Sequence, residues 1–178
     1  MEKKLEGIIK ARENLKLDIE TYFVDIIAWD ELEKIVKKSD IIFTCLDNLE
    51  ARLEINLWAV KYKKPLIDGG TSLNGLRGRV ITVIPYKTPC LGCYFDVETM
   101  YEAENEQTLI ACGASLPTTM AIVAALQVDR GIKVLLGMEK SVIPRIFINL
   151  EEEVNVVPDY NVKRRKNCRF CGYGGAKK

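Results

Sequence analysis

The sequence predicts a single α/β domain over residues 1–178, in which a mostly parallel sheet carries helices on both faces. Two observations lead to this fold class. Apolar runs of strand length alternate with amphipathic stretches of helical spacing, and alternating strands and helices favour parallel pairing. The run at 40–46, DIIFTCL, is continuously apolar, as expected of a strand buried on both faces.

The elements follow from these patterns in chain order. The first part of the chain is expected to alternate helix and strand three times, at 2–13, 17–24, 29–39, 40–46, 48–64 and 65–70. The pattern then changes to a strand opened by glycines, a long helix and two late strands, which add antiparallel pairing, at 75–87, 115–137, 142–153 and 154–160. The long helix is apolar on most sides, so we expect it to be buried, with Pro117 in its first turn and Gly137 at its end.

Composition narrows the functional classes. The net charge of +1 gives no reason to expect nucleic-acid binding, and no apolar run is long enough to span a bilayer. Because no signal peptide is seen, a cytoplasmic location is expected. The chain contains no histidine, so a metal site has to use cysteine or carboxylate ligands.

Four cysteines form two C-x-x-C pairs, Cys90 with Cys93 and Cys168 with Cys171. The two-residue gap lets both sulfurs of a pair reach one metal, and two such pairs complete a tetrahedral, structural Zn²⁺ site. This zinc would hold the C-terminal tail on the domain. The alternatives are two disulfides or four free thiols, and a cytosolic setting disfavours disulfides.

A polar cluster follows the buried strand at 40–46. Asp47 and Asn48 lie where this strand gives way to a helix, which is the edge of an α/β sheet where ligands bind. A carboxylate there can hold Mg²⁺ against nucleotide phosphates, and Arg52 lies close enough along the helix to reach the same place. The alternative is that Asp47 or Asn48 only caps the helix.

Cys112 lies just before the helix expected at 115–137. A helix N-terminus lowers the pKa of a nearby thiol, and Gly113 leaves room for a large substrate, so Cys112 is a candidate nucleophile. The alternative is a small apolar residue packed under the helix. Cys45, inside the run at 40–46, is expected to be an inert core thiol.

Taken together, these motifs resemble the ubiquitin-activating enzyme superfamily, which includes the ThiF- and MoeB-like adenylyltransferases of sulfur-carrier proteins. TCLDNLEARLEIN at 44–56 is similar to the family's D-N-x-x-x-R-x-x-x-N element. The segment at 65–93 resembles its strand, glycine turn, strand and first zinc pair, and CRFCG at 168–172 resembles the second pair. CGASLPTTMAIVAALQ at 112–127 is similar to the catalytic-cysteine segment of the enzyme that activates the ubiquitin-fold modifier.

The resemblance implies a Rossmann-like fold and a two-step reaction. ATP with Mg²⁺ adenylates the C-terminal glycine of a small β-grasp protein, either a ubiquitin-like protein or a sulfur carrier, and a cysteine then displaces AMP in many members. Carried over by position, Asp47 would hold Mg²⁺, Asn48 and Arg52 would lie beside the nucleotide, and Cys112 would accept the acyl group. Family members are usually dimers, so a homodimer or heterodimer is expected.

The sequence departs from the family at its start. The glycine-rich strand–loop–helix that cradles the phosphates is absent, so we expect an N-terminally truncated version of the domain. By position, Lys4 (or Lys3) falls near the family's phosphate-contacting lysine. Three explanations compete: a gene start upstream of Met1, a partner that supplies the nucleotide site, and a degenerate relative that no longer adenylates. Because the truncated sheet would expose an edge and an apolar face, we expect the isolated chain to associate or to be poorly stable.

Two functional hypotheses therefore remain from different classes. One is an ATP-dependent activating enzyme, and the other is a non-catalytic, zinc-stabilised partner subunit or scaffold of such an enzyme. A nicotinamide-dependent oxidoreductase is disfavoured because it would also need a glycine fingerprint.

Overall fold

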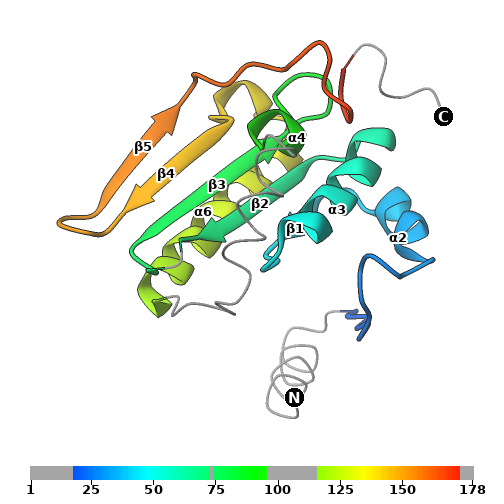
Figure 1. The fold of residues 1–178 in the computed structure, drawn as a ribbon, viewed down its shortest axis with the longest axis horizontal. Coiled ribbons are helices and arrows are strands. Elements are labelled where there is room, and N and C mark those ends of the chain that lie inside the picture. Colours follow the sequence, from blue (N-terminus) through cyan, green and yellow to red (C-terminus); the bar gives the residue numbers. More distant parts are fainter. Residues whose placement is uncertain (1–17, 73, 96–115, 173–178) are drawn as a thin grey trace.

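The structure is a computed structural model that describes residues 18–72, 74–95 and 116–172 (Figure 1). Its elements in chain order are α2 (Leu32–Lys38), β1 (Ile42–Thr44), α3 (Leu49–Lys61), β2 (Leu66–Thr71), β3 (Arg77–Val83), α4 (Leu91–Tyr94), α6 (Pro117–Leu135), the 3-10 helix η1 (Glu139–Ser141), β4 (Arg145–Asn149) and β5 (Asn155–Asp159).

The strands form one five-stranded sheet in the order β1-β2-β3-β4-β5. β1 pairs with β2 in parallel, with Thr44 opposite Asp68, whereas the three other neighbouring pairs are antiparallel. The predicted α/β class with added antiparallel strands is therefore confirmed, but the described parallel part is limited to one pair of strands.

Helices cover both faces of this sheet, as the sequence predicts (Figure 1). On one face, α3 packs on β2 and contacts α2 and α4 in turn, and the core there includes Leu66, Ile81 and Val83. On the other face, α6 packs over β2 and β3 against Ile67 and Val80. Successive residues of β2 and β3 enter opposite cores because strand side chains alternate between the two faces.

Gln127 fastens α6 to the parallel strands. Its side-chain Nε2 donates to the carbonyl oxygens of Thr44 and Ile67, at 3.2 and 3.1 Å. Gly69 permits this approach, since a Cβ at that position would lie 2.2 Å from the Gln127 Oε1. These two hydrogen bonds hold α6 against the face of β1 and β2.

The expectation that α6 is buried on most sides is wrong. Its sheet-facing residues are buried, but Val128, Ile132 and Leu135 on the outer face are 53%, 52% and 58% exposed. None of the described elements covers that face. The predicted end is confirmed, because Gly137 has a φ of 73° and so adopts the left-handed conformation that terminates helices. In the described parts of the chain, we find no helix with the length and hydrophobicity of a membrane span.

The strand expected at 17–24 does not form over 18–24, the part of this range that the structure describes. Phe23 is 92% exposed there, and Tyr22 is 50% exposed. Alternation of apolar residues gives a strand only where a neighbouring backbone is available for pairing, and β1 pairs only with β2 among the described strands. The helix expected at 2–13 lies outside the described residues.

Candidate functional site

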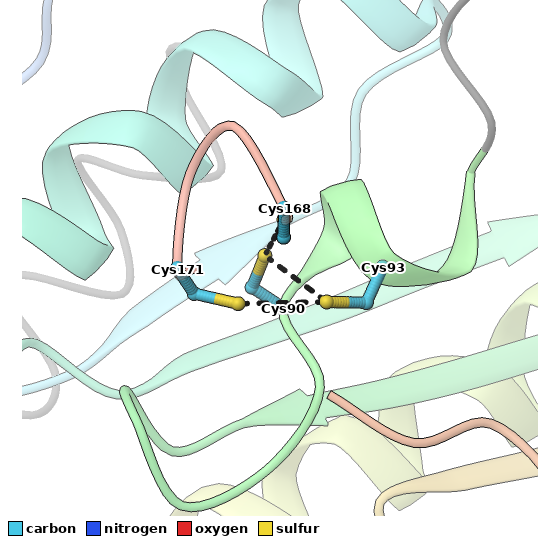
Figure 2. Close-up of side chains that lie close together, drawn as sticks. All are labelled: Cys90, Cys93, Cys168 and Cys171. Carbon is cyan, nitrogen blue, oxygen red and sulfur yellow. Dashed lines mark hydrogen bonds between the residues drawn. The ribbon is translucent and has the colours of Figure 1, made fainter. Parts of the chain in front are cut away.

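The two C-x-x-C pairs meet in one buried cluster (Figure 2). Cys90 and Cys93 flank the start of α4, and Cys168 and Cys171 come from the loop after β5. The four sulfur atoms lie within 4.8 Å of one another, with Sγ–Sγ distances of 3.6 Å for Cys90 to Cys168 and 3.4 Å for Cys93 to Cys171. These distances exclude disulfides, whose sulfurs are about 2.05 Å apart.

The cluster fits a tetrahedral zinc ion. Four Zn–S bonds of about 2.3 Å place the sulfurs roughly 3.8 Å apart, close to the spacing found here. The backbone N–H of Arg165 points at the Cys93 Sγ at 3.4 Å, and the Arg165 side chain donates to the carbonyl of Gly92. An N–H directed at sulfur favours the thiolate that a metal requires. Figure 2 shows that the cysteines join segments far apart in the sequence, which agrees with a metal that holds the C-terminal segment to α4.

Asp47 and Asn48 form the turn between β1 and α3. Asn48 is the N-cap of α3, because its side chain accepts a hydrogen bond of 2.8 Å from the backbone N–H of Ala51. Asp47 is exposed, and its carboxylate accepts a hydrogen bond of 3.3 Å from the Asn48 amide. The capping role of Asn48 is therefore observed, whereas the Asp47 carboxylate keeps oxygens that are open to a ligand.

The Arg52 side chain points away from the turn at Asp47 and Asn48 and toward the sheet. It is 7% exposed, forms an ion pair with Asp68, and donates to the carbonyl oxygens of Gly69 and Leu46. Thr44 donates to the same Asp68 carboxylate at 2.7 Å. Arg52 thus connects the C-terminal ends of β1 and β2, and it holds the backbone that carries Asp47.

Asp68 belongs to this site, and the sequence motifs did not predict it. It is fully buried in β2, at 0% exposure, and its Oδ2 has no hydrogen-bond partner among the described residues. A buried carboxylate needs a partner, because desolvation of an unpaired charge is costly. An aspartate inside the apolar strand at 65–70 is a signal that could have pointed to a buried partner for Arg52.

The remaining predicted residues are placed as follows. Cys112 and Lys4 lie outside the described residues. Cys45 is exposed, so the expectation of a core thiol is wrong. β1 ends at Thr44, and Cys45 belongs to the turn that follows, where its Sγ contacts the Gln127 Oε1 at 3.5 Å.

The sequence profile of the ThiF family matches residues 8–170. The chain belongs to the ThiF family. Curated relatives include ubiquitin-like modifier-activating enzyme 5 of Branchiostoma floridae, 35% identical over 155 residues, which cover 84% of the chain and 37% of the relative. The enzyme of the same name from Gallus gallus is 35% identical over 126 residues, which cover 68% of the chain and 31% of that relative. The resemblance to the ubiquitin-activating superfamily is therefore confirmed.

Two further proteins are similar to the chain at lower identity. Protein HesA of Leptolyngbya boryana is 27% identical over 145 residues, or 79% of the chain and 49% of the relative. A crystal structure of E. coli MccB with ATP superposes with a TM-score of 0.66 at 19% identity, over 91% of the chain and 48% of MccB. This likeness confirms the Rossmann-like fold. The chain spans about half or less of the length of each of these four proteins.

Proposed function

We propose that this chain takes part in the ATP-dependent adenylation of the C-terminal glycine of a small ubiquitin-like or sulfur-carrier protein. The observation that carries the proposal is the exposed Asp47 carboxylate at the end of β1, held in place by the buried Arg52–Asp68 pair. Activating enzymes among the relatives, and a neighbouring fold whose structure holds ATP, support the same reaction class.

In this proposal, an oxygen of the carrier's terminal carboxylate attacks the α-phosphorus of ATP. The bond between that phosphorus and the bridging oxygen breaks, pyrophosphate leaves, and an acyl-adenylate is formed. Bound Mg²⁺ would neutralise phosphate charge, and the Asp47 carboxylate supplies the oxygen ligand that this ion prefers. Arg52 acts as a positioning residue, since its guanidinium is occupied by Asp68 and by two backbone carbonyls.

Mg²⁺–ATP titration of Asp47→Asn tests the nucleotide site. We expect the wild-type chain to bind Mg²⁺–ATP in isothermal titration calorimetry, and the substitution to weaken binding at least about tenfold, because a metal-ligating charge is lost. Asp40→Asn is the matched control, because this exposed aspartate lies at the opposite end of β1. Equal affinities for the wild-type protein and for Asp47→Asn would contradict the assignment of Asp47.

Cys112 is proposed as the acceptor of a second step. Its thiolate would attack the carbonyl carbon of the adenylate, the bond to the AMP oxygen would break, and a thioester would remain. Cys112→Ala is then expected to abolish a thiol-sensitive adduct with the carrier, detected as a mass increase of the intact protein, while pyrophosphate release continues. An adduct that persists in Cys112→Ala would show that another group accepts the acyl chain.

The alternative is a zinc-stabilised scaffold or partner subunit that binds a small protein or a catalytic sister subunit without nucleotide. The four buried cysteines, which fit a structural metal, agree with it as well. Under this alternative, the wild-type chain gives no heat with Mg²⁺–ATP, and Cys112→Ala leaves partner binding unchanged.

A further inference from the structure

Arg79 is a half-buried cation whose Nε has no hydrogen-bond partner among the described residues. It lies in the middle of β3, on the face of the sheet that α3 and α4 cover, and its Nε is inaccessible to solvent. Among the described residues, its direct contact is the ring of Phe95, with the guanidinium carbon 5.0 Å from the ring centroid. A buried guanidinium without acceptors costs free energy, so its presence calls for a ligand or another compensation.

In the part of the chain that the structure describes, Arg79 has no carboxylate paired with it alone. Asp68, the nearby carboxylate, is engaged by Arg52, and Asp159 is engaged by Arg145. Burial lowers the pKa of Arg79, the charges of Arg52 and Arg145 lower it further, and the attraction of Asp68 only partly opposes them. Among the described residues, three guanidinium groups therefore share two carboxylates here, which leaves an excess of one positive charge.

The strand neighbour of Arg79 is a glycine, which leaves room for the guanidinium groups of Arg79 and Arg52. Gly70 lies directly opposite Arg79 in the β2–β3 pair. A Cβ on Gly70 would lie 3.2 Å from the Arg79 Cζ and 3.6 Å from the Arg52 Nη2, so the two guanidinium groups flank a strand position that has no side chain. Arg52 in turn donates to the carbonyl of Leu46, the residue before Asp47. Arg79 is therefore connected to the proposed nucleotide site through Gly70 and Arg52.

We propose that Arg79 binds the terminal carboxylate of the protein substrate and holds it beside the nucleotide before adenylation. This inference rests on the proposed function, because it names a substrate-binding group for the same reaction. Arg79 supplies guanidinium N–H donors, which suit a carboxylate. The bound carboxylate would give Arg79 an ion pair, as Asp68 does for Arg52 and Asp159 for Arg145.

The charge balance favours a carboxylate over a nucleotide phosphate at this position. The cluster has an excess of one positive charge, which a single carboxylate neutralises. A triphosphate carries several negative charges, more than this excess would balance. The aromatic ring of Phe95 on the other side adds no donor for further phosphate oxygens.

The experiment compares two small probes by NMR. The ¹H–¹⁵N resonance of the Arg79 Nε, assigned by its disappearance in Arg79→Gln, is followed in the zinc-loaded chain during titration with N-acetyl-glycylglycine or with its C-terminal amide. We expect a saturable shift with the free carboxylate and none with the amide. Equal shifts with both probes, or no shift with either, would overturn the proposal.

Two variants separate binding from a structural role. Arg79→Gln is expected to weaken binding of the carboxylate probe by at least about tenfold, because a charge-assisted hydrogen bond is removed. Its thermal unfolding midpoint should stay the same or rise, since an unpaired buried charge is removed. Arg77→Gln is the matched control, because Arg77 lies on the same face of β3 but is exposed and paired with Glu151. A lower unfolding midpoint with unchanged probe binding in Arg79→Gln would show a structural residue instead.

The last titration uses Mg²⁺–ATP as the probe. If Mg²⁺–ATP alone shifts the Arg79 resonance and displaces the carboxylate probe, Arg79 binds phosphate and the carboxylate assignment is wrong. Failure of the nucleotide titration described above would overturn the proposed adenylation without affecting the probe titration. The two conclusions can therefore fail separately.

Discussion

Replacing Cys168 with serine is expected to lower the free energy of unfolding by several kcal/mol and to release the segment after β5 from α4. The four sulfurs lie within 4.8 Å of one another and all four residues are buried. In a structural zinc site the free energy of metal binding becomes free energy of folding, so a lost ligand weakens the whole domain. Urea unfolding monitored by circular dichroism measures the change, and elemental analysis measures the zinc bound per chain.

Cys45→Ser is the matched control for this substitution. Cys45 is exposed and lies outside the cluster, so the same change of sulfur to oxygen should alter stability by no more than about 0.5 kcal/mol. Treatment of the wild-type protein with a strong chelator should reproduce the effect of Cys168→Ser, with faster hydrogen exchange over residues 162–172. If chelation left the unfolding midpoint unchanged, the four-cysteine zinc site would be wrong.

Replacing Asp68 with asparagine is expected to cost about 3–5 kcal/mol, the range for breaking one partner of a buried ion pair. Asparagine keeps the shape of the side chain but leaves the guanidinium of Arg52 without its counter-charge in the interior. Since Arg52 also holds the Leu46 carbonyl, the turn that carries Asp47 should lose its position, and Mg²⁺–ATP affinity should fall with stability. Urea unfolding and calorimetric titration measure the two effects on the same sample.

Glu33→Gln provides the surface comparison. Glu33 also accepts from a cation, Lys61, but both side chains are substantially exposed, so this substitution should leave the unfolding midpoint nearly unchanged. A double-mutant cycle of Asp68→Asn with Arg52→Met tests the buried pair directly. The two substitutions together should cost less than the sum of their separate costs if the two charges interact. An additive result would show that Asp68 and Arg52 stabilise the fold independently.

Local patterns identified most of the elements of this chain. The helical spacing at 48–64 predicted α3, and the short apolar run at 65–70 predicted β2 within one residue. The two C-x-x-C pairs predicted one cluster, because each pair already has the spacing of a metal ligand set before the chain folds. In each case the information lies within a few neighbouring residues, since periodicity and short spacing are local properties.

The predictions that differ from the structure depended on a partner far away in the chain. The alternation at 17–24 is that of a strand, but no described strand pairs with 18–24. The apolar residues of α6 predicted burial on most sides, yet no described element packs on its outer face. Burial requires a neighbour, and a sequence pattern shows that a side chain can be buried without showing what will cover it.

By itself, the sequence determined the fold class, the four cysteines that form one cluster, and the placement of Asp47 and Asn48 after β1. Only the tertiary structure decided what the arginines do. Arg52 faces the buried Asp68, and Arg79 lies in the same region with an Nε that has no partner among the described residues. The reason is electrostatic: the energy of a charged side chain depends on desolvation and on the other charges within a few ångströms, and folding brings those charges together from distant positions.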